Sequence, residues 1–168
     1  MATNFYETLA LAAFALLGLW WVVVADRRRE WSVLPYRRRQ AYTVSLYFTM
    51  TGIMSLVSLI SEAHPAIWRL AFGISAGIGA AEVVLSLAYA HAEPSRQRLV
   101  QGLLALTLPL YLAVVAVAIH PALASDVGVH LKPLETEAIA VSLVLFIGIN
   151  YGWLLFMEPA RPPGEADQ

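Results

Sequence analysis

The sequence has no cysteine and few charged residues, and both absences limit what the protein can be. Without cysteine the chain has no disulfides, no thiolate metal sites and no quinone-linked thiol chemistry. Charged residues make up 14% of its 168 residues, whereas a soluble domain carries about 25% to cover its surface. Hydrophobic residues make up 59%. These proportions predict a membrane protein.

Several chemical motifs are missing as well. No lysine lies within an apolar run, which excludes a retinal Schiff base. The sequence contains no HExxH, no GxSxG and no paired-aspartate motif. Few polar residues could act together at one depth of a membrane. The sequence therefore favours a protein that is not an enzyme, without deciding the question, and we expect no cofactor and no nucleic-acid partner.

The apolar residues form five runs of about 20 residues, the length at which a helix spans a hydrocarbon core of about 30 Å. The predicted fold is therefore all-α, a bundle of five transmembrane helices in one domain over residues 1–158. The polar, proline-rich tail over 159–168 is predicted to be disordered. The predicted spans are 5–25, 41–60, 67–91, 99–119 and 138–156.

Basic residues lie almost entirely on one side of these spans. Nine of the 11 lysine and arginine residues fall in the loops 26–40 and 92–98 or in the tail. An excess of positive charge marks the cytoplasmic side of a membrane protein. We therefore expect a multi-pass protein of the cell inner membrane, with its N-terminus outside and its C-terminus and tail in the cytoplasm.

The 26–40 loop carries two arginine triplets around aromatic residues. Such charges are typical of topology determinants that contact lipid phosphates. They could also form a docking site for an anionic lipid or an acidic partner protein, because basic residues are attracted to anionic membrane surfaces. The candidate contact residues are Arg27, Arg28, Arg29, Arg37, Arg38 and Arg39.

Polar side chains form one stripe on the second predicted span and another on the third, at the 100° per residue of a helix. Two neighbouring polar faces indicate a hydrated pathway or a hydrogen-bonded seam. Residues at similar depth on the fourth and fifth spans extend this layer. The predicted buried polar layer consists of Tyr47, Thr51, Ser55, Ser75, Glu82, Ser86, Thr107 and Asn150.

Glu82 is the unusual member of that layer. A carboxylate near the middle of a bilayer is rare and faces a bundle interior or a cavity. We therefore expect Glu82 to point into the bundle and to hydrogen-bond Asn150, Tyr47 or both, directly or through water. It would act either as a proton or cation site or as a protonated group that holds helices together.

Gly73 and Gly77 on the third span form a small-xxx-small pattern. Small residues at this spacing let two helices approach closely. The pattern predicts close packing, either within the bundle or between subunits.

Two histidines precede prolines at the ends of apolar runs, and their pattern has two interpretations. Proline lacks an amide hydrogen and disfavours helical geometry in the residue before it, so each pair favours a helix end. The alternative is a metal or haem site on the outer face, because imidazole and carboxylate groups suit zinc, iron or copper. No HxxxH-type spacing supports this alternative. Its candidate ligands are the histidines His64, His120 and His130, with the carboxylates of Glu62, Asp126, Glu135 and Glu137.

Three functions fit these features. The first is a small, oligomeric membrane protein that provides a polar pathway for a proton, cation or small solute past Glu82. The second is a non-catalytic accessory or anchor subunit of a larger membrane complex, since the loops are short and a soluble domain is absent. The third is a metal- or haem-binding membrane protein that uses the outer-face histidines.

Overall fold

A computed structural model of the chain describes residues 2–32, 35–60, 64–90, 98–123, 128 and 131–157. These residues form helices joined by turns, and no strand occurs among them. The helices are α1 (Ala2–Asp26), the short α2 (Arg28–Trp31), α3 (Pro35–Ile60), α4 (Pro65–Ala90), α5 (Arg98–Ile119) and α7 (Pro133–Phe156).

Five of these helices are long and apolar enough to cross a membrane. The shortest of the five crossing segments, Leu99–Ile119, has 21 residues, and at 1.5 Å per residue it covers about 30 Å. That length matches the hydrocarbon thickness of a bilayer. The prediction of an all-helical protein with five membrane-spanning helices is therefore confirmed for the described residues.

Helices α3 and α7 begin earlier than the sequence predicted, at residues 35 and 133 rather than 41 and 138. Each begins with a proline, whose fixed φ and missing N–H suit the first turn of a helix. The start of α7 is also held by Glu135, whose Oε2 accepts a hydrogen bond from the Lys132 amide at 3.1 Å. These extensions place Arg39 and Glu137 within the helical bundle.

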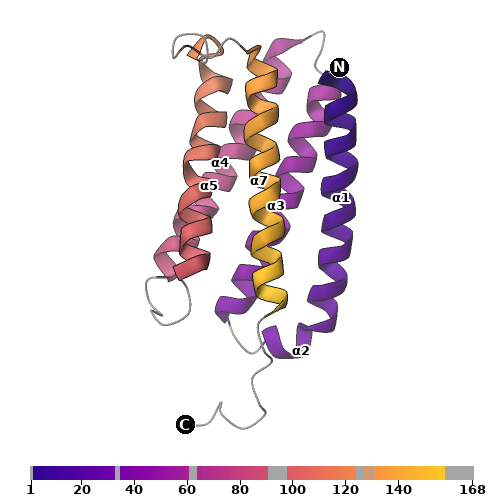
Figure 1. The fold of residues 1–168 in the computed structure, drawn as a ribbon, viewed down its shortest axis with the longest axis vertical. Coiled ribbons are helices and arrows are strands. Elements are labelled where there is room, and N and C mark those ends of the chain that lie inside the picture. The colour runs from indigo at the N-terminus through magenta and orange to yellow at the C-terminus, as the bar shows by residue number, and fades with distance from the viewer. Residues whose placement is uncertain are drawn as a thin grey trace.

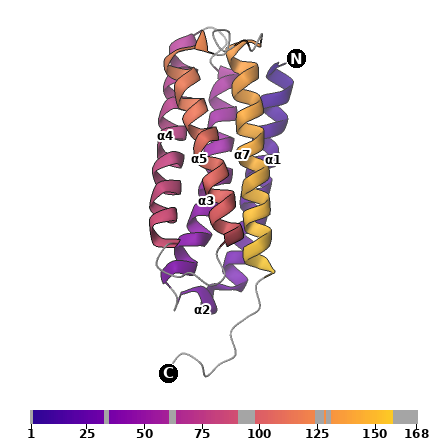
Figure 2. The ribbon, with the colours of Figure 1, turned by 60° about the vertical axis from the view of Figure 1, so that its left-hand side comes forward.

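Helix α3 packs against α1, α4 and α7, and it lies behind α7 in the view of Figure 1. The long helices pack in the order α1, α3, α4, α5 and α7, and α7 closes the ring against α1. Helix α3 also packs against α7 across this ring. Successive long helices run in opposite directions (Figures 1 and 2). The face of α3 that points inward is thus enclosed by the other helices.

The short helix α2 lies at the end of the bundle where α1 connects to α3 (Figure 1). Its Trp31 is buried, and the Trp31 ring lies 5.8 Å from the ring of Trp20 on α1. Trp20 Nε1 donates a hydrogen bond to the Ala41 carbonyl oxygen of α3 at 3.0 Å. These contacts hold α1, α2 and α3 together at this end.

Close helix packing depends on Gly79, because α5 places the Tyr111 ring directly against it. A Cβ atom at residue 79 would lie 2.6 Å from Tyr111 Cε1, well inside the separation of about 3.5–4.0 Å at which carbon atoms pack. A Cβ at Gly77 would meet nothing within 4 Å, and a Cβ at Gly73 would meet only Ala118 Cβ, at 3.9 Å. Within the described part of the chain, the Gly73–Gly77 pattern therefore makes no tight contact.

These two glycines give a matched pair of substitutions. We expect Gly79→Ala to lower the free energy of unfolding by about 1–3 kcal/mol, because the added methyl group overpacks the α4–α5 contact. Gly77→Ala should be neutral or raise it by up to about 1 kcal/mol through helix propensity. Denaturant unfolding of both variants in detergent tests this difference. An equal loss of unfolding free energy in Gly77→Ala would contradict the conclusion that Gly79, and not Gly77, makes the tight helix contact.

Candidate functional site

A polar stripe winds slowly around α3 over most of its length. Arg39, Thr43, Tyr47, Thr51 and Ser55 recur at every fourth residue, so each lies about 40° around the helix from the one before. The last four are buried, none more than 2% exposed. From residue 39 to residue 55 this stripe covers about 24 Å, most of the thickness of a hydrocarbon core. The bundle therefore encloses a polar line of nearly membrane-spanning length.

At the α2 end of this line, Glu82 of α4 forms an ion pair with α3. Arg39 Nη2 donates a hydrogen bond to Glu82 Oε2 at 3.1 Å. Glu82 Oε1 accepts hydrogen bonds from Thr43 Oγ1 at 3.0 Å and Ser86 Oγ at 3.2 Å. The Glu82 side chain is 11% exposed and that of Arg39 is 28% exposed. Both carboxylate oxygens are thus bonded in a mostly buried network.

These partners differ from the predicted ones, Asn150 and Tyr47. Asn150 is half-buried on α7, and its side-chain amide donates to the Phe146 carbonyl oxygen at 2.8 Å. A direct hydrogen bond between Asn150 and Glu82 is therefore ruled out. The physical reason is the earlier start of α3, which brings the Arg39 guanidinium within reach of Glu82.

The middle of the polar line consists of tyrosines. Tyr47 donates a hydrogen bond to Thr107 Oγ1 of α5 at 3.1 Å instead of to Glu82. The Tyr47 ring stacks on Tyr111 at a centroid distance of 6.2 Å and meets Tyr151 edge-on at 6.3 Å. Tyr47, Tyr111 and Glu82 line a cavity of about 10 Å³, which has room for about one water molecule.

At the opposite end of the line, Glu137 is buried without a partner. Its side chain is 1% exposed, and neither carboxyl oxygen has a hydrogen-bond partner among the described groups. The hydroxyl groups of Thr51 and Ser55 are likewise buried and unpaired there. Such groups are rare in native structures, because burying an unpaired polar atom is costly. These three unpaired side chains mark this half of the core as a candidate functional region.

The sequence placed Glu137 in an outer-face loop as a candidate metal ligand, because the predicted span began one residue later; the structure buries it within α7 instead. Tyr6 of α1 lies close enough to interact electrostatically with Glu137. The Tyr6 hydroxyl donates to the Leu134 carbonyl oxygen at 2.6 Å, one turn before Glu137 on α7. The signal that could have located Glu137 is the helix start at Pro133, followed by Glu135 in the first turn.

The structure brings most of the predicted polar layer together and leaves one member apart. The stripe on α4 faces the stripe on α3, as the contact of Ser86 Oγ with Thr43 Oγ1 at 3.1 Å illustrates. Asn150 does not join them. The members that lie in the core are Tyr47, Thr51, Ser55, Ser75, Glu82, Ser86 and Thr107.

The proposed histidine ligands lie at helix ends where the structure describes them. His64 immediately precedes α4 and His120 immediately follows α5, and both side chains are exposed. The first histidine–proline pair thus begins a helix instead of ending one. Glu62 and His130 lie outside the described residues. Within the ranges that the structure describes, no three His, Asp or Glu side chains are grouped so that they could hold a metal ion.

Comparisons with protein-family models, with curated proteins and with solved structures find no match for this chain. The protein belongs to the class of all-helical proteins with five helices able to span a membrane. Its function has to be inferred from its own geometry.

The ion pair predicts a measurable coupling between its two residues. In a double-mutant cycle, Arg39→Met and Glu82→Gln should show a coupling free energy between about 0.5 and 3 kcal/mol, because removing Arg39 alone leaves a buried charge unpaired. Arg38→Met serves as the control, since Arg38 is exposed and makes no bond to Glu82. Denaturant unfolding measures all of these variants. Purely additive effects for Arg39 and Glu82 would contradict the ion pair.

Proposed function

We propose that this protein conducts protons through the core of its helical bundle, between Glu137 near one membrane surface and Glu82 toward the other. The observation that carries the proposal is the unpaired carboxyl group of Glu137, which is 1% exposed. Buried ionisable residues within membrane spans mark proton relays and ion pathways. A carboxyl group in such a place avoids the cost of a buried charge by binding a proton.

The two carboxyl groups lie at different depths of the bundle. Helices α4 and α7 begin at the same end of the molecule (Figure 1). Residue 137 lies near the start of α7 and residue 82 far along α4, so the two are about 20 Å apart along the bundle axis. The polar stripe of α3 extends between these levels, and it can therefore connect them.

Hydroxyl groups supply the intermediate positions. Each hydroxyl both donates and accepts hydrogen bonds, so a chain of them can pass a proton onward. Thr51 and Ser55 have unpaired hydroxyl groups in the core. The hydrogen bond from Tyr47 to Thr107 and the cavity of about 10 Å³ beside Glu82 continue the line. Thr43 and Ser86 then lead to the Glu82 carboxylate.

The size of the core favours a proton over a cation or a solute. The cavity beside Glu82 accommodates about one water molecule. A hydrated cation or a small solute needs a wider passage than the packed rings of Tyr47 and Tyr111 leave. The proposed route also lies within a single chain, so it needs no oligomer.

Proton flux into liposomes tests this function. Purified protein in vesicles that contain a pH-sensitive dye should dissipate an imposed pH gradient faster than empty vesicles do. Glu137→Gln should reduce this flux at least about tenfold, because the amide keeps the size of the side chain but cannot carry a proton, and general acid–base groups contribute about 100-fold or more to proton transfer. Glu82→Gln should also lower the flux.

Glu7→Gln is the matched control, because Glu7 lies on α1 at the same end of the bundle as Glu137 but is exposed. It should retain the flux of the unmodified protein. No flux above empty vesicles, or equal flux in Glu137→Gln, would contradict proton conduction.

We also propose that α2 faces the cytoplasm of the cell and that the N-terminus lies outside, because the arginine-rich segment 26–40 is at the α2 end. The absence of native cysteines makes labelling straightforward. Ser32→Cys directly follows α2 and Ala122→Cys comes shortly after α5, and these two helices end at opposite ends of the bundle (Figure 1); both positions are exposed. A membrane-impermeant thiol reagent applied to intact cells should label only Ala122→Cys. Labelling of Ser32→Cys alone would contradict this orientation and would place α2 on the outer side of the membrane.

A further inference from the structure

The arginines around α2 differ in what they contact. Arg39 pairs with Glu82, and Arg37 Nη1 donates to Gln40 Oε1 at 3.3 Å. Arg27 Nη2 donates to the carbonyl oxygen of the last residue of α7 at 3.3 Å. The exposed arginines for which the described groups provide no partner are Arg28, Arg29 and Arg38. Within the described part of the chain, these three guanidinium groups are therefore exposed and unbonded.

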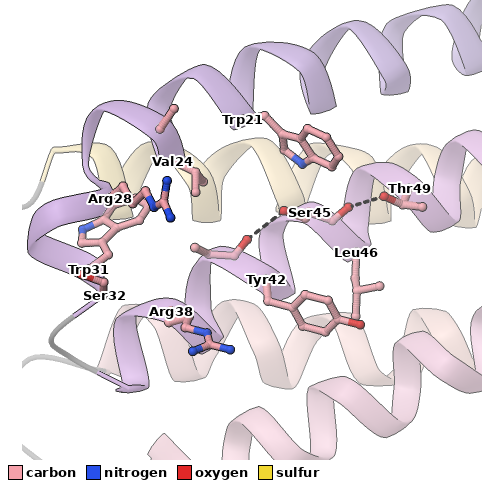
Figure 3. A pocket seen from close by; sticks show the side chains of 12 residues that line it. Trp21, Val24, Arg28, Trp31, Ser32, Arg38, Tyr42, Ser45, Leu46 and Thr49 are labelled. Carbon is pink, nitrogen blue, oxygen red and sulfur yellow. Dashed lines mark hydrogen bonds between the residues drawn. The ribbon is translucent and has the colours of Figure 1, made fainter.

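Two of the three lie at one end of a groove between α1 and α3 (Figure 3). The groove has a volume of about 840 Å³, and Arg28, Ser32 and Arg38 line its α2 end. Arg29 does not line it. The remaining lining residues are Trp21, Val24, Ala25, Trp31, Ala41, Tyr42, Ser45, Leu46 and Thr49.

Away from the arginines the groove wall is apolar. The aliphatic hydroxyl groups there are bonded to their own helix, Ser45 Oγ to the Ala41 carbonyl oxygen at 3.0 Å and Thr49 Oγ1 to the Ser45 carbonyl oxygen at 2.8 Å (Figure 3). The rings of Trp21 and Tyr42 are 63% and 57% exposed, so the groove opens on the outer face of the bundle. In a membrane, that face meets lipid.

We infer that this groove binds one anionic phospholipid of the surrounding membrane. Its phosphate would bind the guanidinium groups of Arg28 and Arg38, and an acyl chain would lie along α3 toward Thr49. From residue 38 to residue 49 the wall extends about 16 Å, which suits a chain lying along the helix. Guanidinium groups bind phosphate through paired hydrogen bonds.

The charge of the groove selects the headgroup. Among the lining residues that the structure describes there is no aspartate or glutamate, so these residues offer no partner to the amine of a zwitterionic headgroup. An anionic headgroup such as that of phosphatidylglycerol has no amine, so its binding leaves no ammonium group without a partner. The site is separate from the proposed proton line, because the Glu82 network lies on a different face of α3.

Native mass spectrometry of the purified full-length protein tests the site, with dioleoylphosphatidylglycerol and dioleoylphosphatidylcholine as probes. The protein should retain one phosphatidylglycerol in preference to phosphatidylcholine. Each basic residue near an anionic lipid changes affinity by about fivefold, so Arg28→Gln/Arg38→Gln should weaken phosphatidylglycerol binding by about 25-fold. Arg29→Gln removes an equal charge outside the groove and should bind like the unmodified protein.

A groove-filling variant distinguishes a bound lipid from a free phosphate ion. Ser45→Trp keeps both arginines but occupies the wall, so it should lose phosphatidylglycerol, and inorganic phosphate should not compete in the unmodified protein. Ala25→Trp blocks the groove from α1 and replaces Ser45→Trp if circular dichroism shows that variant unfolded.

Three results would overturn the inference. Equal binding of the two lipids would remove headgroup selection, and an equal loss in Arg29→Gln would leave only general attraction between charges. Undiminished lipid binding in a folded groove-filling variant would place the lipid elsewhere.

Discussion

The polar face of α3 has to be enclosed by protein, because hydrocarbon offers no hydrogen bonds to side chains or backbone. The rest of the bundle is arranged around this constraint. Helices α1, α4 and α7 pack against α3, and α5 reaches it through the hydrogen bond between Tyr47 and Thr107. Glycines permit the close approach that this needs. A Cβ atom at Gly148 would lie 2.7 Å from Tyr47 Cβ, so a larger residue there would push α7 away from α3.

The two ends of the enclosed line are in different electrostatic situations. Glu82 has a guanidinium partner and two hydroxyl donors, so its charge is compensated within the protein. Glu137 has no partner among the described groups. The line therefore has an unpaired, buried carboxyl group toward one end and an ion pair toward the other. The arginines differ as well, since Arg39 bonds Glu82 whereas Arg28 and Arg38 are exposed.

The sequence predicted the helices and the polar stripes because both depend on local patterns, namely the length of an apolar run and the 100° period. It placed the helix ends less well, since residues 35–40 and 133–137 are polar and lower the hydropathy of their segments. Those few residues include Arg39 and Glu137, so Arg39 was not predicted to pair with Glu82, and Glu137 was expected in an outer loop instead of in the core. The sequence could not show that Gly79, and not Gly77, makes a tight helix contact, because that contact is with Tyr111 of another helix.

Infrared spectroscopy of the protein in liposomes tests the central claim most directly, since a neutral carboxylic acid has its own carbonyl stretching band. The account predicts such a band at neutral pH, present in Glu7→Gln, absent in Glu137→Gln, and shifted after transfer to deuterated water because the buried group exchanges its proton with the solvent. A spectrum without a band from Glu137, or a band that stays unshifted in deuterated water, would contradict a proton route through this core.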